Sequence, residues 1–271
     1  MIDNLRAYHG EILGTLFAAT VVAAAWLEVF WPRRTADAPR APRWIANLSL
    51  GAGNVILFAL VVPLGAFAAA LIAEQHDWGV LRLTAMPDWL AILLGVLAID
   101  LFAYMSHRLM HGVPVLWSLH HVHHSDIDID FTTTVRHHPF EALAAAVMIF
   151  GAVLALGISP ESVVIHQIAA TVLDFVEHSN LQIPQRLDAA IRLVFVTPDM
   201  HVVHHSSLRQ ETDSNYGTVL SLWDRLFGTY VTAPAAGVTG MTIGLDDRRA
   251  AADQRIDQVL LSPFIRRPSP N

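Results

Sequence analysis

Residues 119–126 read LHHVHHSD, which places four histidines within five positions of a chain that contains no cysteine. Imidazole is the commonest metal ligand among side chains, and it is the only side chain whose unperturbed pKa lies near neutrality. The stretch is therefore a metal site, a pH-sensitive switch or a chance of composition. The positions of the other histidines decide between these three.

Thirteen of the fifteen histidines lie between residues 107 and 205, and their spacing repeats. HxxxH occurs at 107–111, and HxxHH occurs at 120–124 and again at 201–205. Positions i, i+3 and i+4 share one face of a helix, so we expect each HxxHH to present three imidazoles toward one point. His121 points elsewhere on that helix and is the expected non-ligand.

The number of imidazoles indicates two metal ions. Up to ten imidazoles from five segments exceed the four ligands that one zinc ion takes. Nitrogen ligands suit iron, zinc, copper and nickel alike, so the residue types do not fix the element. We expect the isolated histidines to be structural, namely His9, His76 and His166.

Carboxylates accompany the histidines, as expected where metal-bound imidazoles donate their second N–H to an acid. Asp100 and Asp174 lie in apolar stretches, where an ionisable group is by default functional and faces the protein interior. Asp174 precedes His178 by four residues and could itself reach a metal. The alternative is an ordinary structural acid. The acids close to histidines in sequence are Asp100, Asp126, Glu141, Asp174, Glu177 and Asp199.

The composition predicts an all-α, multi-span membrane bundle. Hydrophobic residues make up 54% of the 271 residues and charged residues 15%, against roughly 25% charged in ordinary globular proteins. A spanning helix needs about 20 apolar residues. Four or five stretches qualify, the second being tilted, kinked at Pro63 or broken and the last two forming a hairpin across GISP: 11–31, 45–73, 88–106, 141–157 and 160–177.

We expect a single membrane domain, 1–271, with three parts. These are N-terminal membrane helices (1–98), a histidine-rich catalytic region (99–233) that includes the hairpin 141–177, and a polar, loosely held tail (234–271). Four arginines in the loop 32–43 place that loop in the cytoplasm by the positive-inside rule. Every histidine-dense stretch then lies on the cytoplasmic face, as a di-metal cap. The net charge of −7 argues against nucleic acid as a partner.

The ordered motifs resemble the fatty acid hydroxylase superfamily of integral-membrane di-iron enzymes, whose bacterial members are often labelled sterol desaturase family proteins. The resemblance covers about 100–264, through SHRLMH (106–111), WSLHHVHHS (117–125), RHHPFE (136–141), EHSN (177–180), TPDMHVVHHS (197–206), NYG (215–217), LWDRLFGT (222–229) and QVLLSPF (258–264).

The resemblance implies ten metal ligands and several residues around them. Some members have HxxxH where this chain has Asp174 and His178, so either Asp174 replaces a nitrogen ligand or His138 completes the set. Asp174, Asp100, Glu141, Asp199 and Asn180 are further candidates for contact with the ligands or the metal. The implied ligands are His107, His111, His120, His123, His124, His138, His178, His201, His204 and His205.

The resemblance also implies O2-dependent oxidation of an alkyl C–H bond of a membrane lipid by two iron ions, for which zinc could substitute in a purified sample. The lipid is fatty acyl, sterol-like or isoprenoid, and we favour hydroxylation over desaturation. Electrons are expected from a separate ferredoxin or reductase, because the sequence has no haem, flavin or iron–sulfur motif. The expected location is a bacterial inner membrane.

Two functions of other classes compete with this prediction. A membrane zinc hydrolase would need a motif such as HExxH or HxxEH, and neither occurs. A metal transporter should place its ligands near mid-membrane, whereas these histidines lie at helix ends and in polar stretches. Iron content and O2 dependence separate both functions from an oxygenase.

Overall fold

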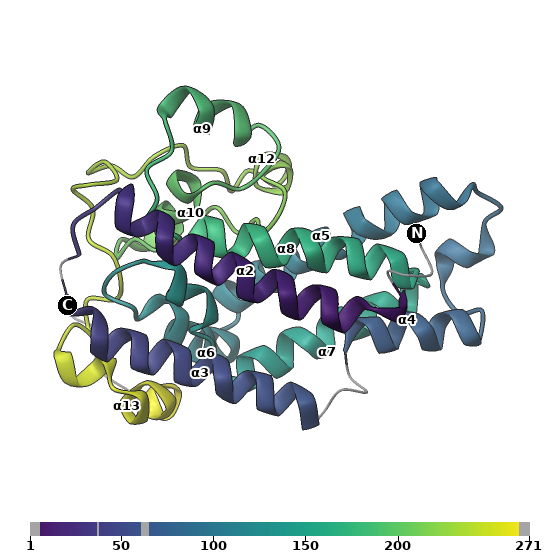
Figure 1. The fold of residues 1–271 in the computed structure, drawn as a ribbon, viewed down its shortest axis with the longest axis horizontal. Coiled ribbons are helices and arrows are strands. Elements are labelled where there is room, and N and C mark those ends of the chain that lie inside the picture. Colours follow the sequence, from purple (N-terminus) through teal and green to yellow (C-terminus); the bar gives the residue numbers. More distant parts are fainter. Residues whose placement is uncertain (1–5, 37, 61–64, 266–271) are drawn as a thin grey trace.

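The computed structural model describes residues 6–36, 38–60 and 65–265, and in these ranges the regular structure is helical, with isolated β-bridges only. Five long helices run along the long axis of the molecule (Figure 1). Four of them are long and apolar enough to cross a membrane. The predicted all-helical membrane bundle is thus confirmed. The long helices are α2 (His9–Phe30), α3 (Arg40–Leu60), α5 (Asp88–Gly112), α7 (Pro139–Leu156) and α8 (Pro160–His178).

The fifth long helix, α8, is not among the four candidate spans. It carries three acids, Glu161, Asp174 and Glu177, and much of its surface is buried against α2, α4, α5 and α10. A helix that is covered by its neighbours needs fewer lipid-compatible side chains than one that faces the bilayer. The segment 160–177 is therefore a packed inner helix.

The predicted second segment, 45–73, consists of two separate helices. α3 ends at Leu60, and α4 (Ala66–Gln75) begins after residues 61–64, so the kink predicted at Pro63 lies outside the described residues. At about 1.5 Å per residue, the ten residues of α4 are about 15 Å long, half of what a span requires. The short helix η2 (Val80–Leu83) follows α4.

GISP joins α7 to α8 as the sequence predicts, with Gly157 in a left-handed conformation (φ 68°) and Ser159 capping α8. The two helices nevertheless do not pack along each other: α7 packs mainly on α4 and α5, and α8 packs mainly on α2 and α5. The prediction of a paired hairpin was therefore wrong in its packing. The reason is the apolar cluster that α4 and α5 share with both helices, which includes Ala70, Ile99, Val153 and Val163.

Short helices form a cap at the end of the bundle where α2 and α8 finish (Figure 1). The cap helices α6 and α10 and the long helix α7 each have proline in the first turn. At this position the missing N–H of proline breaks no helical hydrogen bond. The cap elements are α6 (Pro114–His124), η3 (Phe131–Val135), α9 (Gln185–Ile191), α10 (Pro198–His204), α11 (Arg209–Thr212) and α12 (Leu222–Leu226).

Buried ion pairs fasten the loop between α6 and α7 to α3. Arg43 is only 1% exposed and pairs with Asp126 and Asp130, while Asn47 donates to Asp126 at 2.9 Å. Arg136, fully buried, donates to the Val122 carbonyl at 2.8 Å. Buried charges need such complete pairing. The network fixes the end of α6, where the first HxxHH lies.

The polar tail is packed, and the expectation that it is loosely held was wrong for residues 234–265. The tail forms η4 (Ala251–Gln254), α13 (Ile256–Leu261) and η5 (Ser262–Phe264). Val259 is 1% exposed and packs with Leu50 and Val122. Gln254 donates to the Ser125 carbonyl at 3.0 Å. A few apolar residues spaced through a polar sequence are enough to anchor it across α3 and α6.

Candidate metal centre

The structure gathers nine of the ten predicted histidine ligands into two adjacent groups. Within each group, the potential donor atoms all lie within 4.8 Å of one another. The rings of the two groups touch, for example between His124 and His205, whose centroids are 4.9 Å apart. The five-histidine group consists of His107, His111, His120, His124 and His204. The four-histidine group consists of His123, His178, His201 and His205.

Each HxxHH motif is divided between the two groups, so the expectation that its three imidazoles converge on one point was wrong. In a helix, residue i+4 lies about 40° from residue i, and residue i+3 about 60° to the other side. His120 and His124 therefore point into one group while His123 points into the other. The second motif is divided in the same way: His201 and His205 belong to the four-histidine group, and the middle histidine, His204, belongs to the five-histidine group.

The ring nitrogens are spaced as ligands of common ions would be. In the four-histidine group, Nε2 of His178 lies 3.1 Å from Nε2 of His123 and 3.0 Å from that of His201. In the other group, Nε2 of His120 lies 3.1 Å from those of His107 and His124. Metal–nitrogen bonds of about 2.1 Å place two ligands about 3.0 Å apart at right angles and about 3.4 Å apart in a tetrahedron. The donor sets therefore fit metal ions.

Buried nitrogens without partners support the same interpretation. Among the described residues, Nε2 of His111 and Nε2 of His204 are buried and have no hydrogen-bond partner, although both rings face the five-histidine group. Unsatisfied buried polar atoms are rare in folded proteins and need an explanation. A cation bound between these rings would supply the missing partner.

Burial keeps these imidazoles neutral. Desolvation, reinforced by neighbouring imidazoles, holds the pKa of His123, His201 and His205 well below the usual value. The pKa values of His124 and His204 are lowered in the same way. Only neutral imidazole has a lone pair to donate. The cluster is therefore ready for metal at neutral pH.

Hydrogen bonds at Nδ1 orient four rings of the five-histidine group so that Nε2 faces inward. His120 bonds to the Glu141 carboxylate at 2.7 Å and His111 to Asp213 at 3.1 Å. The other two bond to main-chain carbonyls, His107 to Tyr216 at 2.9 Å and His204 to Ser214 at 2.7 Å. Such contacts fix the tautomer and the direction of a ligand.

The four-histidine group has fewer such contacts. His178 donates from Nδ1 to the main-chain carbonyl of Asp174 at 2.7 Å. Nδ1 of His123 and of His201 are buried and, among the described residues, lack a partner. The Glu177 carboxylate is nearest to the latter, at 3.9 Å, which is too far for a hydrogen bond.

His138, the tenth predicted ligand, lies outside both groups. Its ring accepts from the Phe140 amide and donates to the Leu260 carbonyl at 3.3 Å. Its neighbour His137 faces the site instead, stacked on His123 with centroids 4.5 Å apart and bonded to Glu141 at 2.8 Å. The sequence RHHPFE offers both histidines, and the start of α7 at Pro139 decides which one turns inward.

Asp100 is buried, at 1% exposure, and Asp174 is half-buried with its Oδ1 atom shielded from solvent; neither belongs to a histidine group. The carboxylate of Asp100 accepts from Trp223 at 2.8 Å and from His166 at 3.3 Å, so it ties α5 to the cap and α8. Asp174 touches His178 through its main-chain oxygen only. His166 likewise lies outside both histidine groups.

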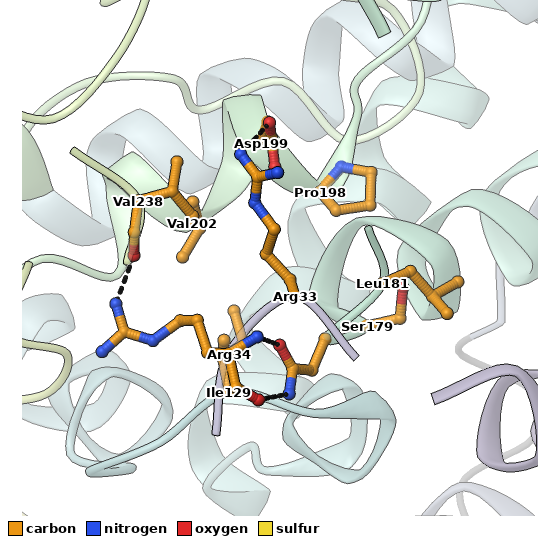
Figure 2. A pocket seen from close by; sticks show the side chains of 10 residues that line it. Arg33, Arg34, Ile129, Ser179, Leu181, Pro198, Asp199, Val202 and Val238 are labelled. Carbon is orange, nitrogen blue, oxygen red and sulfur yellow. Dashed lines mark hydrogen bonds and ion pairs between the residues drawn. The ribbon is translucent and has the colours of Figure 1, made fainter. Parts of the chain in front are cut away.

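Asp199 and Asn180 hold the N-terminal basic loop and also lie outside the groups. Asp199 pairs with Arg33 at 2.7 Å (Figure 2). Asn180 exchanges two hydrogen bonds with the main chain of Arg34. The cavity between them has a volume of about 10 Å³, room for one water molecule at most. The loop and both histidine groups thus lie at the same end of the bundle.

Sequence reasoning missed the main-chain contribution of residues 213–217. Asn215 adopts a positive φ of 50° and is held by hydrogen bonds to the main chain of Met200 and Val231. This turn aims the carbonyls of Ser214 and Tyr216 at two histidines. The motif NYG was a usable signal, but a carbonyl has no sequence signature.

Comparison with known proteins places this site in a family. The sequence model described as fatty acid hydroxylase matches residues 92–229, which include all nine histidines of the two groups. The chain is 32% identical over 172 residues to alkylglycerol monooxygenase of Homo sapiens, covering 62% of this chain and 37% of that protein. No solved structure matches the chain significantly.

Two further relatives are named as lipid hydroxylases. The ornithine lipid hydroxylase OlsE of Rhizobium tropici is 29% identical over 206 residues, covering 73% of this chain and 60% of that protein. The sphingolipid C4-hydroxylase sur2 of Schizosaccharomyces pombe is 26% identical over 136 residues, or 49% of this chain and 45% of that protein. The chain thus spans less than two thirds of the length of these relatives. The match over half of its residues shows that the chain belongs to the fatty acid hydroxylase family.

Proposed function

We propose that this chain is an O2-dependent hydroxylase that uses two iron ions to oxidise an alkyl carbon of a membrane lipid. The observation that carries the proposal is the pair of adjacent histidine groups at the end of a membrane bundle. Two ions bound there would supply O2 activation and oxidation of a C–H bond. The nine ligands would be the histidines of the two groups, and His137 would adjoin them.

The names of the relatives favour hydroxylation of lipids. The three relatives compared are named as a monooxygenase or hydroxylase of an alkylglycerol, an ornithine lipid and a sphingolipid. A hydroxylation inserts one oxygen atom of O2 and reduces the other to water, so two electrons and two protons must enter. We expect an external ferredoxin or reductase to deliver the electrons.

The protein's own residues would orient and neutralise the site. Glu141 bonds to both His120 and His137, and it places one negative charge against the cationic ions. Burial excludes water from eight of the nine imidazoles, and His107 is half-buried. We propose, from the four arginines of loop 32–43, that this end of the bundle faces the cytoplasm of a bacterial cell.

The test combines metal content with oxygen labelling in purified protein in lipid nanodiscs. We expect one iron ion for each histidine group, and an alcohol that carries isotope from labelled O2 when lipid and a reductant are supplied. An alkene without label would indicate desaturation at the same site. Label from water, with zinc bound, would indicate a hydrolase and contradict the proposal. His76→Ala is the matched control, because His76 stacks on Trp78 away from the site.

A further inference from the structure

Two segments of the cap expose a group of large apolar side chains that no part of the described chain covers. Leu193 and Leu226 are 67% and 65% exposed, and the four other apolar side chains of the surface are at least 40% exposed. We call this surface the α9–α12 patch. It consists of Leu193, Val194 and Phe195, which follow α9, and Leu222, Leu226 and Phe227 in and after α12.

The two segments form one continuous surface. The Ser221 amide donates to the Val194 carbonyl at 3.0 Å, and Phe195 pairs with Leu220 as an antiparallel bridge. These contacts bring together two segments that lie about 30 residues apart in the sequence and that carry three apolar side chains each. Contiguous apolar surface of this kind marks contact with a partner or a membrane.

The outward charge of these segments is cationic. Arg186 and Arg225 are exposed, whereas the only two acids within residues 185–195 and 220–228 are buried, Asp188 at 4% and Asp224 at 0% exposure. Asp188 is engaged by Arg192 and Asp224 by main-chain amides. Exposed apolar residues combined with arginines are the pattern of segments that lie in the membrane interface.

The position of the patch agrees with such a contact. α9 and α12 lie to one side of the long helices, near the end of the bundle where α2 finishes (Figure 1). α12 is also fixed to the spanning helix α5, because Trp223 donates to Asp100 at 2.8 Å. The patch is thus held in a fixed position relative to a candidate spanning helix.

We infer that the α9–α12 patch inserts its apolar side chains into the membrane interface, with its arginines at anionic lipid headgroups. The contact would also hold the metal centre at a fixed height. Asp224 accepts hydrogen bonds from the amides of Tyr216 and Gly217, and the Tyr216 carbonyl orients His107. The inference does not depend on the proposed oxidation.

The absence of cysteine from the chain permits a direct test. Single nitroxide labels at Leu193→Cys and Leu226→Cys are examined by electron paramagnetic resonance in nanodiscs of phosphatidylcholine and phosphatidylglycerol. For each label we compare the accessibility of the nitroxide to two paramagnetic reagents. These are O2, which concentrates in the bilayer, and a nickel chelate, which stays in water. Val22→Cys, at a 69% exposed site on spanning α2, is the lipid reference, and Ala236→Cys, in an exposed turn, is the water reference.

We expect both patch labels to match Val22→Cys in their preference for O2. Accessibility like that of Ala236→Cys would overturn the inference, and so would shielding from both collision partners, which would indicate a covering protein. Adding Arg186→Gln to Leu193→Cys should reduce the preference for O2 in discs with phosphatidylglycerol and not in discs of phosphatidylcholine alone. An equal response in both discs would contradict the role given to anionic headgroups. None of these sites touches the histidines, so the result is independent of catalysis.

Discussion

The two histidine groups are alike in burial and differ in how their rings are held. In the five-histidine group, four Nδ1 atoms bond to Glu141, Asp213 and the carbonyls of Ser214 and Tyr216. In the four-histidine group, His178 has such a bond, to a main-chain oxygen. The first group is therefore preorganised by hydrogen bonds, and the second depends more on packing. We expect the second group to bind its metal more weakly.

The largest effects should come from removal of a donor, and they should follow the groups and not the sequence motifs. His124→Ala and His204→Ala should both deplete metal from the five-histidine group, although they lie in different motifs. His123→Ala and His201→Ala should both deplete the four-histidine group. Each loss should exceed the roughly 10–100-fold that an orienting residue contributes to metal affinity.

Metal content by mass spectrometry and metal affinity by titration check this pairing. If His123→Ala and His124→Ala, which lie in the same motif, lost metal from the same group, the division of each motif between the two groups would be wrong. Full metal content and activity in any of the four variants would remove that residue from the ligand set. His9→Ala should leave both measurements unchanged, because its ring stacks on Phe67 far along the bundle from the site.

Acid should destabilise both groups together, since burial is what they share. The folded pKa values of His123, His124, His201, His204 and His205 lie below the unfolded value, so the unfolded chain binds more protons as the pH falls. The free energy of unfolding of metal-free protein should fall once the pH drops below about 6.5, by about 1.4 kcal/mol per pH unit for each such histidine.

Thermal unfolding of metal-free protein in detergent between pH 8 and 5 measures this effect. A flat midpoint across that range would mean that these histidines are not buried and neutral in the folded state. His137 is the internal contrast, because the Glu141 carboxylate, acting against burial, raises the pKa of His137. We therefore expect His137→Ala to leave the acid sensitivity in place.

Substitution of the acids near the histidines should lower metal affinity less than removal of a ligand does, and the size of the loss should differ between the two groups. Glu141→Gln weakens hydrogen bonds from His120 and His137 and should lower metal affinity of the five-histidine group by about 10–100-fold. Glu177→Gln should change affinity less, because its carboxylate lies 3.7 Å from His178 and makes no hydrogen bond there. Equal losses in the two variants would show that the groups do not differ as the contacts suggest.

The smallest effects should come from His138→Ala and Asp174→Asn. His138 bonds to the Leu260 carbonyl outside the groups, and Asp174 orients His178 through a main-chain oxygen that asparagine retains. We expect metal content and turnover to stay near those of the unsubstituted protein. Loss of metal in His138→Ala would restore it to the ligand set, and loss in Asp174→Asn would give its carboxylate a direct role.

The sequence by itself determined the class of the molecule and most of its donors. The proportion of apolar residues required a membrane bundle, and the two HxxHH motifs and the HxxxH motif named eight of the nine histidines that the fold brings together; the ninth, His178, was a candidate through the motif EHSN. These properties depend on composition and on local spacing along a helix, which a sequence contains in full. The packing of the tail at Val259 did not follow, because it depends on contacts with distant residues.

Only the tertiary structure decided which donors share an ion and what holds them. Helical spacing separates the middle histidine of each motif from the other two, but which histidines of α6 and α10 share a group depends on where these two helices meet. The choice of His137 over His138 depends on the direction of the chain at Pro139. The carbonyls of Ser214 and Tyr216 became orienting groups through a turn at Asn215, and every residue has a carbonyl. Long-range geometry, and not residue type, therefore made two groups out of one row of histidines.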